Sequence, residues 1–140
     1  MKAKTRRAAE TRWLYRTENT MFKSNVYANC DMPIEYLRRL AKRVWEKEAP
    51  KGRRFPTIIA NAGQSWGGRF TSYCEGFTFI ALARHHRNVL VLLHELTHAL
   101  GPCVHGPKFV RLYFYLLRKY ARFNQDFLQG VAAGRGIVLT

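Results

Sequence analysis

The chain has few acidic residues and few cysteines. Its 140 residues include nine Asp and Glu against 24 Lys and Arg, which gives a formal net charge of +15 at pH 7. Such an excess favours a polyanionic partner, nucleic acid first and an anionic membrane or cell-wall surface second. The cysteines, Cys30, Cys74 and Cys103, are odd in number and have no paired spacing. They argue against a disulfide framework and favour a reducing, cytoplasmic compartment.

Long apolar runs are also missing. No stretch approaches the roughly 20 apolar residues of a membrane-spanning helix, and no apolar segment follows the basic N-terminus, Met1 to Arg7, as it would in a secretory signal. The hydrophobic fraction of 47% nevertheless indicates a folded core. We therefore expect one folded domain without a transmembrane segment, located in the cytoplasm.

One apolar stretch, from Val89 to Gly101, contains two histidines and a glutamate. His94 and His98 are four residues apart, so on a helix both rings lie on one face and can bind the same metal ion. Glu95 takes the position of the general base in HExxH metallopeptidases. The alternative is a buried helix whose histidines are satisfied by hydrogen bonds, but burying these three side chains is costly without a function.

The sequence leaves few candidates for a third metal ligand. After Glu95 the only acidic residue is Asp126 and the only further histidine outside the motif is His105. A glycine and a proline can end the helix before His105, so a short loop can bring this ring back to the first two. Cys103 and Asp126 are weaker alternatives, and we expect Cys103 to be a buried or half-buried thiol. No methionine follows Met32, which disfavours a metzincin.

The two motifs, HELTH at 94–98 and HGPKF at 105–109, resemble those of the SprT-like zinc metallopeptidases. The resemblance is nearest to small bacterial and phage metallohydrolases in which HGPxF follows HExxH at short spacing, whereas many SprT-like proteases have a longer segment between the motifs. It implies a compact zincin-like fold, zinc bound by His94, His98 and His105, and Glu95 as catalytic base. For a phage-encoded protein the compartment would be the host cytoplasm.

The expected fold class is α+β, with a basic N-terminal arm (1–30) before a single zincin-like domain (31–140). Within the arm, Trp13 and Leu14 are expected to contact the core, and residues 21–29 show no periodicity, which indicates a loop. Asp31 is the expected N-cap of the first helix and Asn88 that of the metal helix. The periodicity predicts helices at 32–49, 89–100, 109–122 and 126–133, three strands at 55–61, 69–75 and 77–83, and a small C-terminal strand at 137–139.

Several further residues are candidates for function. The cationic face of helix 32–49 and the segment after it could contact nucleic acid without sequence preference. Tyr113 is a candidate oxyanion donor, and Trp66 either lines a cleft or caps a hairpin. His85 and His86 are adjacent, so their rings diverge and a surface loop is expected. The candidate nucleic-acid contacts are Arg38, Arg39, Lys42, Arg43, Arg53 and Arg54.

These patterns predict a zinc-dependent endopeptidase that acts on proteins near nucleic acid, with an extended peptide added along the edge of strand 77–83. Two other functions stay open. One is a basic nucleic-acid-binding protein, from a phage or a bacterium, whose metal site is structural or vestigial. The other is a peptidoglycan peptidase whose positive charge meets an anionic cell wall.

Overall fold

The helix that carries the HExxH motif, α4 (Val89–Leu100), lies at the centre of the molecule and contacts α2, α3, α5, β2 and β3. It begins as the sequence predicts, because the Asn88 side chain accepts a hydrogen bond of 2.8 Å from the backbone N–H of Val91. It ends at Gly101, whose φ of 153° is readily adopted only by glycine. Nine of its twelve residues are buried, so the motif is held on a rigid core element.

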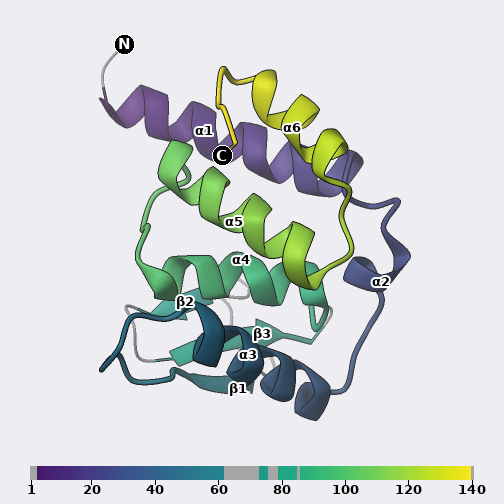
Figure 1. The fold of residues 1–140 in the computed structure, drawn as a ribbon, viewed down its shortest axis with the longest axis vertical. Coiled ribbons are helices and arrows are strands. Elements are labelled where there is room, and N and C mark those ends of the chain that lie inside the picture. Colours follow the sequence, from purple (N-terminus) through teal and green to yellow (C-terminus); the bar gives the residue numbers. More distant parts are fainter. Residues whose placement is uncertain (1–2, 62–72, 76–78, 85, 140) are drawn as a thin grey trace.

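The computed structural model describes residues 3–61, 73–75, 79–84 and 86–139. Within these ranges the chain forms six helices and one three-stranded sheet, which confirms a mixed helix-and-strand fold (Figure 1). The sheet lies on one side of α4, and α5 and α6 lie on the other. No helix in the described part of the chain is long and apolar enough to cross a membrane.

The sheet consists of β1 (Thr57–Asn61), β2 (Tyr73–Glu75) and β3 (Phe79–Ala83) in the order β1-β3-β2. β3 pairs in parallel with β1 and antiparallel with β2. The prediction that the last strand offers a free edge to a peptide is therefore wrong. β3 is central, and its residues 80–83 are buried, as its continuous apolar run allows. Residues 69–72, the Gly76 turn and Trp66 lie outside the described residues.

Helix α3 (Ile34–Glu48) has the apolar stripe that its periodicity predicts, and the side chain of Leu40 joins it. The expected N-cap is wrong: Pro33 occupies that position without a side-chain hydrogen bond, and Asp31 lies outside the helix. Proline fits here because its fixed φ suits the start of a helix. The buried residues of the stripe are Leu37, Leu40, Ala41, Val44 and Trp45.

Helix α5 (Pro107–Tyr120) begins with a proline and buries an apolar face against α4. Its far end is tied to α3 through Glu48, whose carboxylate accepts hydrogen bonds from Tyr115, Lys119 and Tyr120. Burial alone would raise the pKa of Glu48, but these three donors outweigh it and the net shift is downward. This link places α5, and with it the second motif, relative to the rest of the core.

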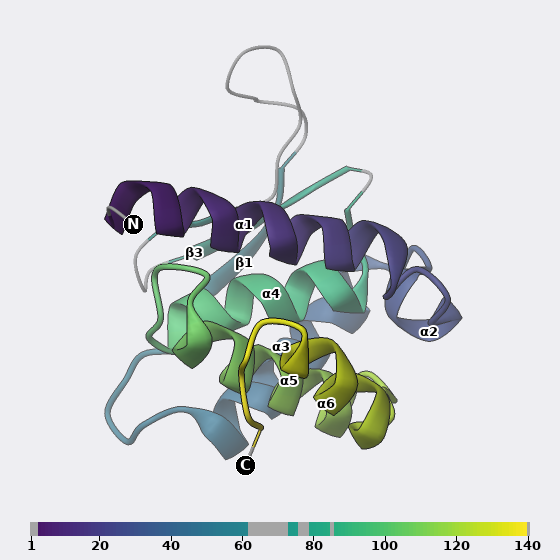
Figure 2. The ribbon, with the colours of Figure 1, turned by 90° about the horizontal axis from the view of Figure 1, so that it is seen from above.

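The N-terminal segment, for which the sequence predicts a basic arm, forms the 18-residue helix α1 (Ala3–Thr20). Leu14 is fully buried, as expected, and the Trp13 ring lies 6.4 Å from that of Phe114 on α5. Full burial of a leucine side chain contributes about 1.5–3 kcal/mol, so α1 belongs to the core. In Figure 2, α1 lies alongside α4.

Two short segments differ from their predictions. Residues 21–29, expected as a loop, include the short helix α2 (Val26–Asn29), whose first turn is capped by the Asn25 side chain. The C-terminal segment forms no strand within the described residues, although Ile137 is buried after α6 (Gln125–Ala133). The burial of Ile137 and a 3.1 Å hydrogen bond from Nε of Arg111 to the carbonyl oxygen of Val138 hold this short tail without the pairing of a strand.

Candidate metal centre

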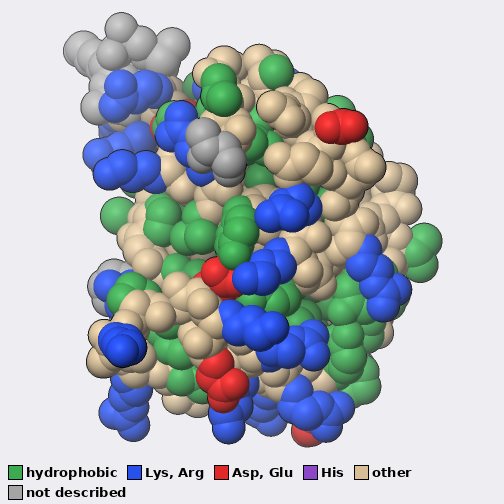
Figure 3. All heavy atoms as spheres, in the orientation of Figure 1, with side chains coloured by type: hydrophobic (Ala, Val, Ile, Leu, Met, Phe, Trp, Pro, Cys, Tyr) green, Lys and Arg blue, Asp and Glu red, His purple; other side chains and the backbone are tan. Residues whose placement is uncertain are grey.

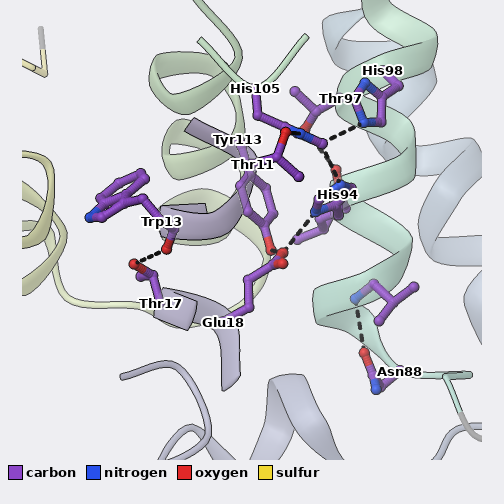
Figure 4. Close-up of polar contacts among 12 residues, drawn as sticks. Thr11, Trp13, Thr17, Glu18, Asn88, His94, Thr97, His98, His105 and Tyr113 are labelled. Atoms are coloured by element: carbon purple, nitrogen blue, oxygen red, sulfur yellow. Dashed lines mark hydrogen bonds and ion pairs between the residues drawn. The ribbon is translucent and has the colours of Figure 1, made fainter. Parts of the chain in front are cut away.

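The side chains of His94, His98 and His105 meet at one point (Figure 4). The Nε2 atom of His105 lies 3.1 Å from Nε2 of His98 and 3.2 Å from Nε2 of His94. His94 and His98 come from successive turns of α4, and His105 comes from the loop between α4 and α5. The structure thus brings together the three residues that the sequence predicts as ligands.

These distances fit a divalent metal ion. With Zn–N bonds of 2.0–2.1 Å, two nitrogen ligands of a tetrahedral ion are about 3.3 Å apart. The distances from Nε2 of His105 to Nε2 of His98 and of His94, 3.1 and 3.2 Å, are close to this value. Three neutral imidazoles with an open fourth position form the donor set of a catalytic zinc site. The cluster can therefore hold one metal ion.

The opposite ring nitrogens show which atoms are free to bind a metal. Nδ1 of His98 lies 2.9 Å from the carbonyl oxygen of Pro102, and Nδ1 of His94 lies 2.7 Å from Oε2 of Glu18. Both partners accept hydrogen bonds, so in the neutral rings the proton sits on Nδ1. Nδ1 of His105 is 3.0 Å from the Thr11 hydroxyl. The Nε2 lone pairs of His94 and His98 thus face the common point.

Phe109, the aromatic residue of the second motif, forms the floor under the histidines. Its ring centroid lies 5.0 Å from that of His94, 4.6 Å from that of His98 and 4.9 Å from that of His105. It is fully buried on the first turn of α5. An apolar floor of this kind limits the access of water and the rotation of the rings, which strengthens metal binding.

Glu95 lies beside the cluster on α4 and is only 7% exposed. Burial raises its pKa to about 7, while His94 acts to lower it and Glu18 to raise it. No hydrogen bond to its carboxylate is present among the residues that the structure describes. A carboxylate in this position, with a pKa near neutrality, is suited to proton transfer.

Burial and neighbouring charges also affect the histidine rings. Burial acts to lower the pKa of His94, but the hydrogen bond and charge of Glu18, with the charge of Glu95, raise it overall. The pKa of His105 is lowered to about 4 by burial and by the two neighbouring histidines. The pKa of His98 is lowered mainly by burial. His98 and His105 are therefore neutral at pH 7, as metal ligands must be.

Helix α1 supplies residues at the centre that the sequence alone does not reveal. Thr11 contacts His105, and Glu18 contacts His94. Tyr15, 48% exposed, has its ring 6.2 Å from that of His94 and 5.6 Å from that of His105. Their i, i+4, i+7 spacing places all three on one helix face. That spacing is the one feature of the sequence that could have indicated these residues. It is too common in helices to single them out.

The structure gives Tyr113 a different partner from the one predicted. Its hydroxyl donates a 2.6 Å hydrogen bond to Oε2 of Glu18, and the side chain is fully buried. Burial, with the nearby charge of Glu18, raises its pKa well above the ordinary value. In this arrangement the hydroxyl of Tyr113 donates its hydrogen bond to Glu18. The role of Tyr113 as an oxyanion donor stays a prediction.

The candidate nucleic-acid contacts fall into three groups. Arg38, Arg39 and Lys42 line one pocket of about 490 Å³ together with residues 55–58. Arg53, by contrast, donates a 2.9 Å hydrogen bond to the carbonyl oxygen of Leu100, where it stabilises the C-terminus of α4. Arg43 and Arg54 are exposed outside this pocket. None of the lining residues belongs to the histidine cluster.

The remaining candidates lie outside the histidine cluster. Cys103 is exposed, so the expectation of a buried or half-buried thiol is wrong, because it lies in the loop that turns away after α4. Asp126 is exposed at the start of α6. His86 is exposed on the loop before α4, and His85 lies outside the described residues. Neither Cys103 nor Asp126 belongs to the group that can hold a metal.

The chain was compared with protein-family models, with curated proteins and with solved structures, and none of the three comparisons found a match.

Proposed function

We propose that the protein is a zinc-dependent metallopeptidase of the SprT-like, zincin type. The observation that carries the proposal is the convergence of three histidine Nε2 atoms beside the buried carboxylate of Glu95. Imidazole ligands suit zinc, as they do other transition-metal ions, and three of them with an open fourth position form the donor set of catalytic zinc sites. The order of the two motifs, with the aromatic residue Phe109 in the second, is that of the family that the sequence resembles.

The residues of the site have separate roles in peptide hydrolysis. His94, His98 and His105 hold the ion, which, when bound, polarises a peptide carbonyl and increases the acidity of water. Glu95 accepts the proton of the attacking water and later delivers it to the leaving amine. The exposed Tyr15 ring lies at the side of the cluster that is open to solvent, where a substrate chain approaches. The buried Phe109 ring packs against the rings of all three histidines.

Removal of the metal tests this proposal directly. Incubation with a strong chelator is expected to abolish cleavage of an unfolded protein such as casein, and addition of one equivalent of zinc is expected to restore it. The reason is that the proposal assigns the polarisation of the carbonyl to the metal ion. Fragment formation on gels and metal content by mass spectrometry provide the measurements. Cleavage that continues in fully metal-free protein would contradict the proposal.

The proposal includes a positively charged surface that keeps the enzyme near nucleic acid, which is a polyanion. On the face shown in Figure 3, Lys and Arg side chains are numerous, whereas Asp and Glu side chains are few. Arg38, Arg39 and Lys42 gather at the pocket between α3 and β1. One acidic residue of the helix, Glu35, is close to Arg38, at 3.9 Å. Three cations around a pocket suit the phosphates of a nucleic acid.

Reversing the charge at Arg39 and Lys42 together is expected to weaken binding of a single-stranded oligonucleotide by about 10-fold or more and to reduce its salt dependence. Both side chains are exposed, so the fold should persist. The control is the same reversal at Arg6 and Arg7, which are exposed on α1. Fluorescence anisotropy at several salt concentrations measures the effect. Equal losses for both pairs would indicate general charge attraction in place of a defined surface.

A further inference from the structure

Glu18 lies behind the metal centre as a largely buried carboxylate. Its side chain is 14% exposed, and one oxygen, Oε2, receives two hydrogen bonds, from Nδ1 of His94 at 2.7 Å and from the Tyr113 hydroxyl at 2.6 Å. Figure 4 shows Glu18 pointing from α1 toward His94, with Tyr113 beside it. Two donors from two other helices, α4 and α5, thus hold one carboxylate oxygen in place.

This burial is costly unless the charge of the carboxylate is compensated. Within the described residues, no Lys or Arg forms an ion pair with Glu18, and its ionic contact is with the ring of His94. A divalent ion at the histidine cluster would carry two positive charges, and the carboxylates of Glu18 and Glu95 would carry two negative charges. The buried site would then be neutral overall, which explains how both carboxylates are tolerated.

Thr11 makes the corresponding contact with His105, two helical turns before Glu18 on the same face of α1. The hydroxyl is 3.0 Å from Nδ1 of that ring. A hydroxyl both donates and accepts, so it holds the ring less strictly than a carboxylate does. His98 is held from within its own segment, by the carbonyl oxygen of Pro102. Of these three contacts, the one from Glu18 is the only one that involves a full charge.

We propose that Glu18 is a positioning residue of the metal site: it keeps the proton of His94 on Nδ1 and so directs the Nε2 lone pair toward a bound divalent transition-metal ion. The inference rests on the metal site of the proposed function. It makes α1, which the sequence predicts as a basic arm, a necessary part of that site. Carboxylate partners of this kind typically strengthen metal binding by about 10–100-fold.

The test compares two substitutions in the full-length protein. Glu18→Leu removes both the charge and the acceptor, and we expect the zinc dissociation constant to rise by about 10–100-fold. Glu18→Gln keeps an acceptor oxygen and should give a smaller rise. Glu46→Gln, an exposed position on α3, is the matched control and should leave the constant unchanged. Competition with a chromophoric chelator measures the constant, and circular dichroism of the metal-free variants verifies folding.

A second measurement reports on His94 itself. In long-range ¹H–¹⁵N spectra of the metal-free protein, at a pH where the ring is neutral, His94 of the wild type should carry its proton on Nδ1. Glu18→Leu should shift part of the population to the Nε2-protonated form. A ring protonated on Nε2 in the wild type would overturn the proposal. So would a folded Glu18→Leu variant with unchanged zinc affinity.

These results are independent of the proposed enzymatic activity. A protein that binds zinc but cleaves no substrate would end the peptidase proposal and leave the role of Glu18 intact. If the protein is a chelator-sensitive peptidase but its zinc affinity does not depend on Glu18, the proposed role of Glu18 is wrong and the peptidase proposal stands. A wild type that takes up no divalent metal at all would overturn both.

Discussion

Replacing Glu95 by glutamine is expected to reduce peptide cleavage by about 10²–10⁴-fold, the typical contribution of a general acid–base group. Glutamine has nearly the same shape but cannot accept a proton, so the loss would arise in the chemical step. Zinc should remain bound at one equivalent, because the three converging nitrogens belong to His94, His98 and His105. The measurements are kcat on a fluorogenic peptide and metal content by mass spectrometry.

The matched control for this change is Glu46→Gln, which alters the same functional group at an exposed position on α3. It should keep wild-type activity and metal content. If Glu95→Gln remained fully active with zinc bound, the carboxylate would not be the base. If the variant lost its zinc, the buried Glu95 would serve to hold the site together instead.

Replacing His105 by alanine is expected to weaken zinc binding by more than about 100-fold, the upper range for loss of a group that only supports a ligand. Its Nε2 lies within 3.2 Å of the same atom of both other histidines, so its removal leaves two ligands from one helix. Activity at limiting zinc should disappear with the metal. Metal content after dialysis and a competition titration provide the measurements.

His86→Ala is the control for that substitution, because His86 is exposed on the loop before α4 and outside the group that can hold a metal. It should retain zinc and activity. Full zinc content in His105→Ala would show that two histidines and another donor suffice. The three-histidine site, and the mechanism built on it, would then be wrong.

Much of the fold follows from short-range patterns that the sequence displays directly. The 3.6-residue periodicity located α3, α4 and α5 to within a few residues, and the cap at Asn88 was predicted correctly. Such patterns depend on neighbours within one or two turns, so they can be read before the fold is known. The burial of Leu14 was also foreseen, because an isolated apolar pair in a cationic segment has few other roles.

The arrangement of the sheet did not follow from the sequence. The strand at 79–83 reads as a half-covered edge, yet it lies between β1 and β2. Strand order depends on how the connections cross, and residues along a single strand carry little information about its neighbours. The separate roles of the basic residues did not follow from the sequence either. Arg53 donates a hydrogen bond at the C-terminus of α4, whereas Arg38 and Arg39 line a pocket.

The sequence by itself determined the core of the candidate site. His94, Glu95 and His98 are placed by the pitch of one helix, and His105 follows seven residues later through a loop that its glycine and proline define. Only the tertiary structure decided what surrounds them. Glu18 lies 76 residues from His94 in sequence, and Thr11 lies 94 residues from His105. Contacts over such separations arise because the fold places α1 alongside α4, which no local pattern encodes.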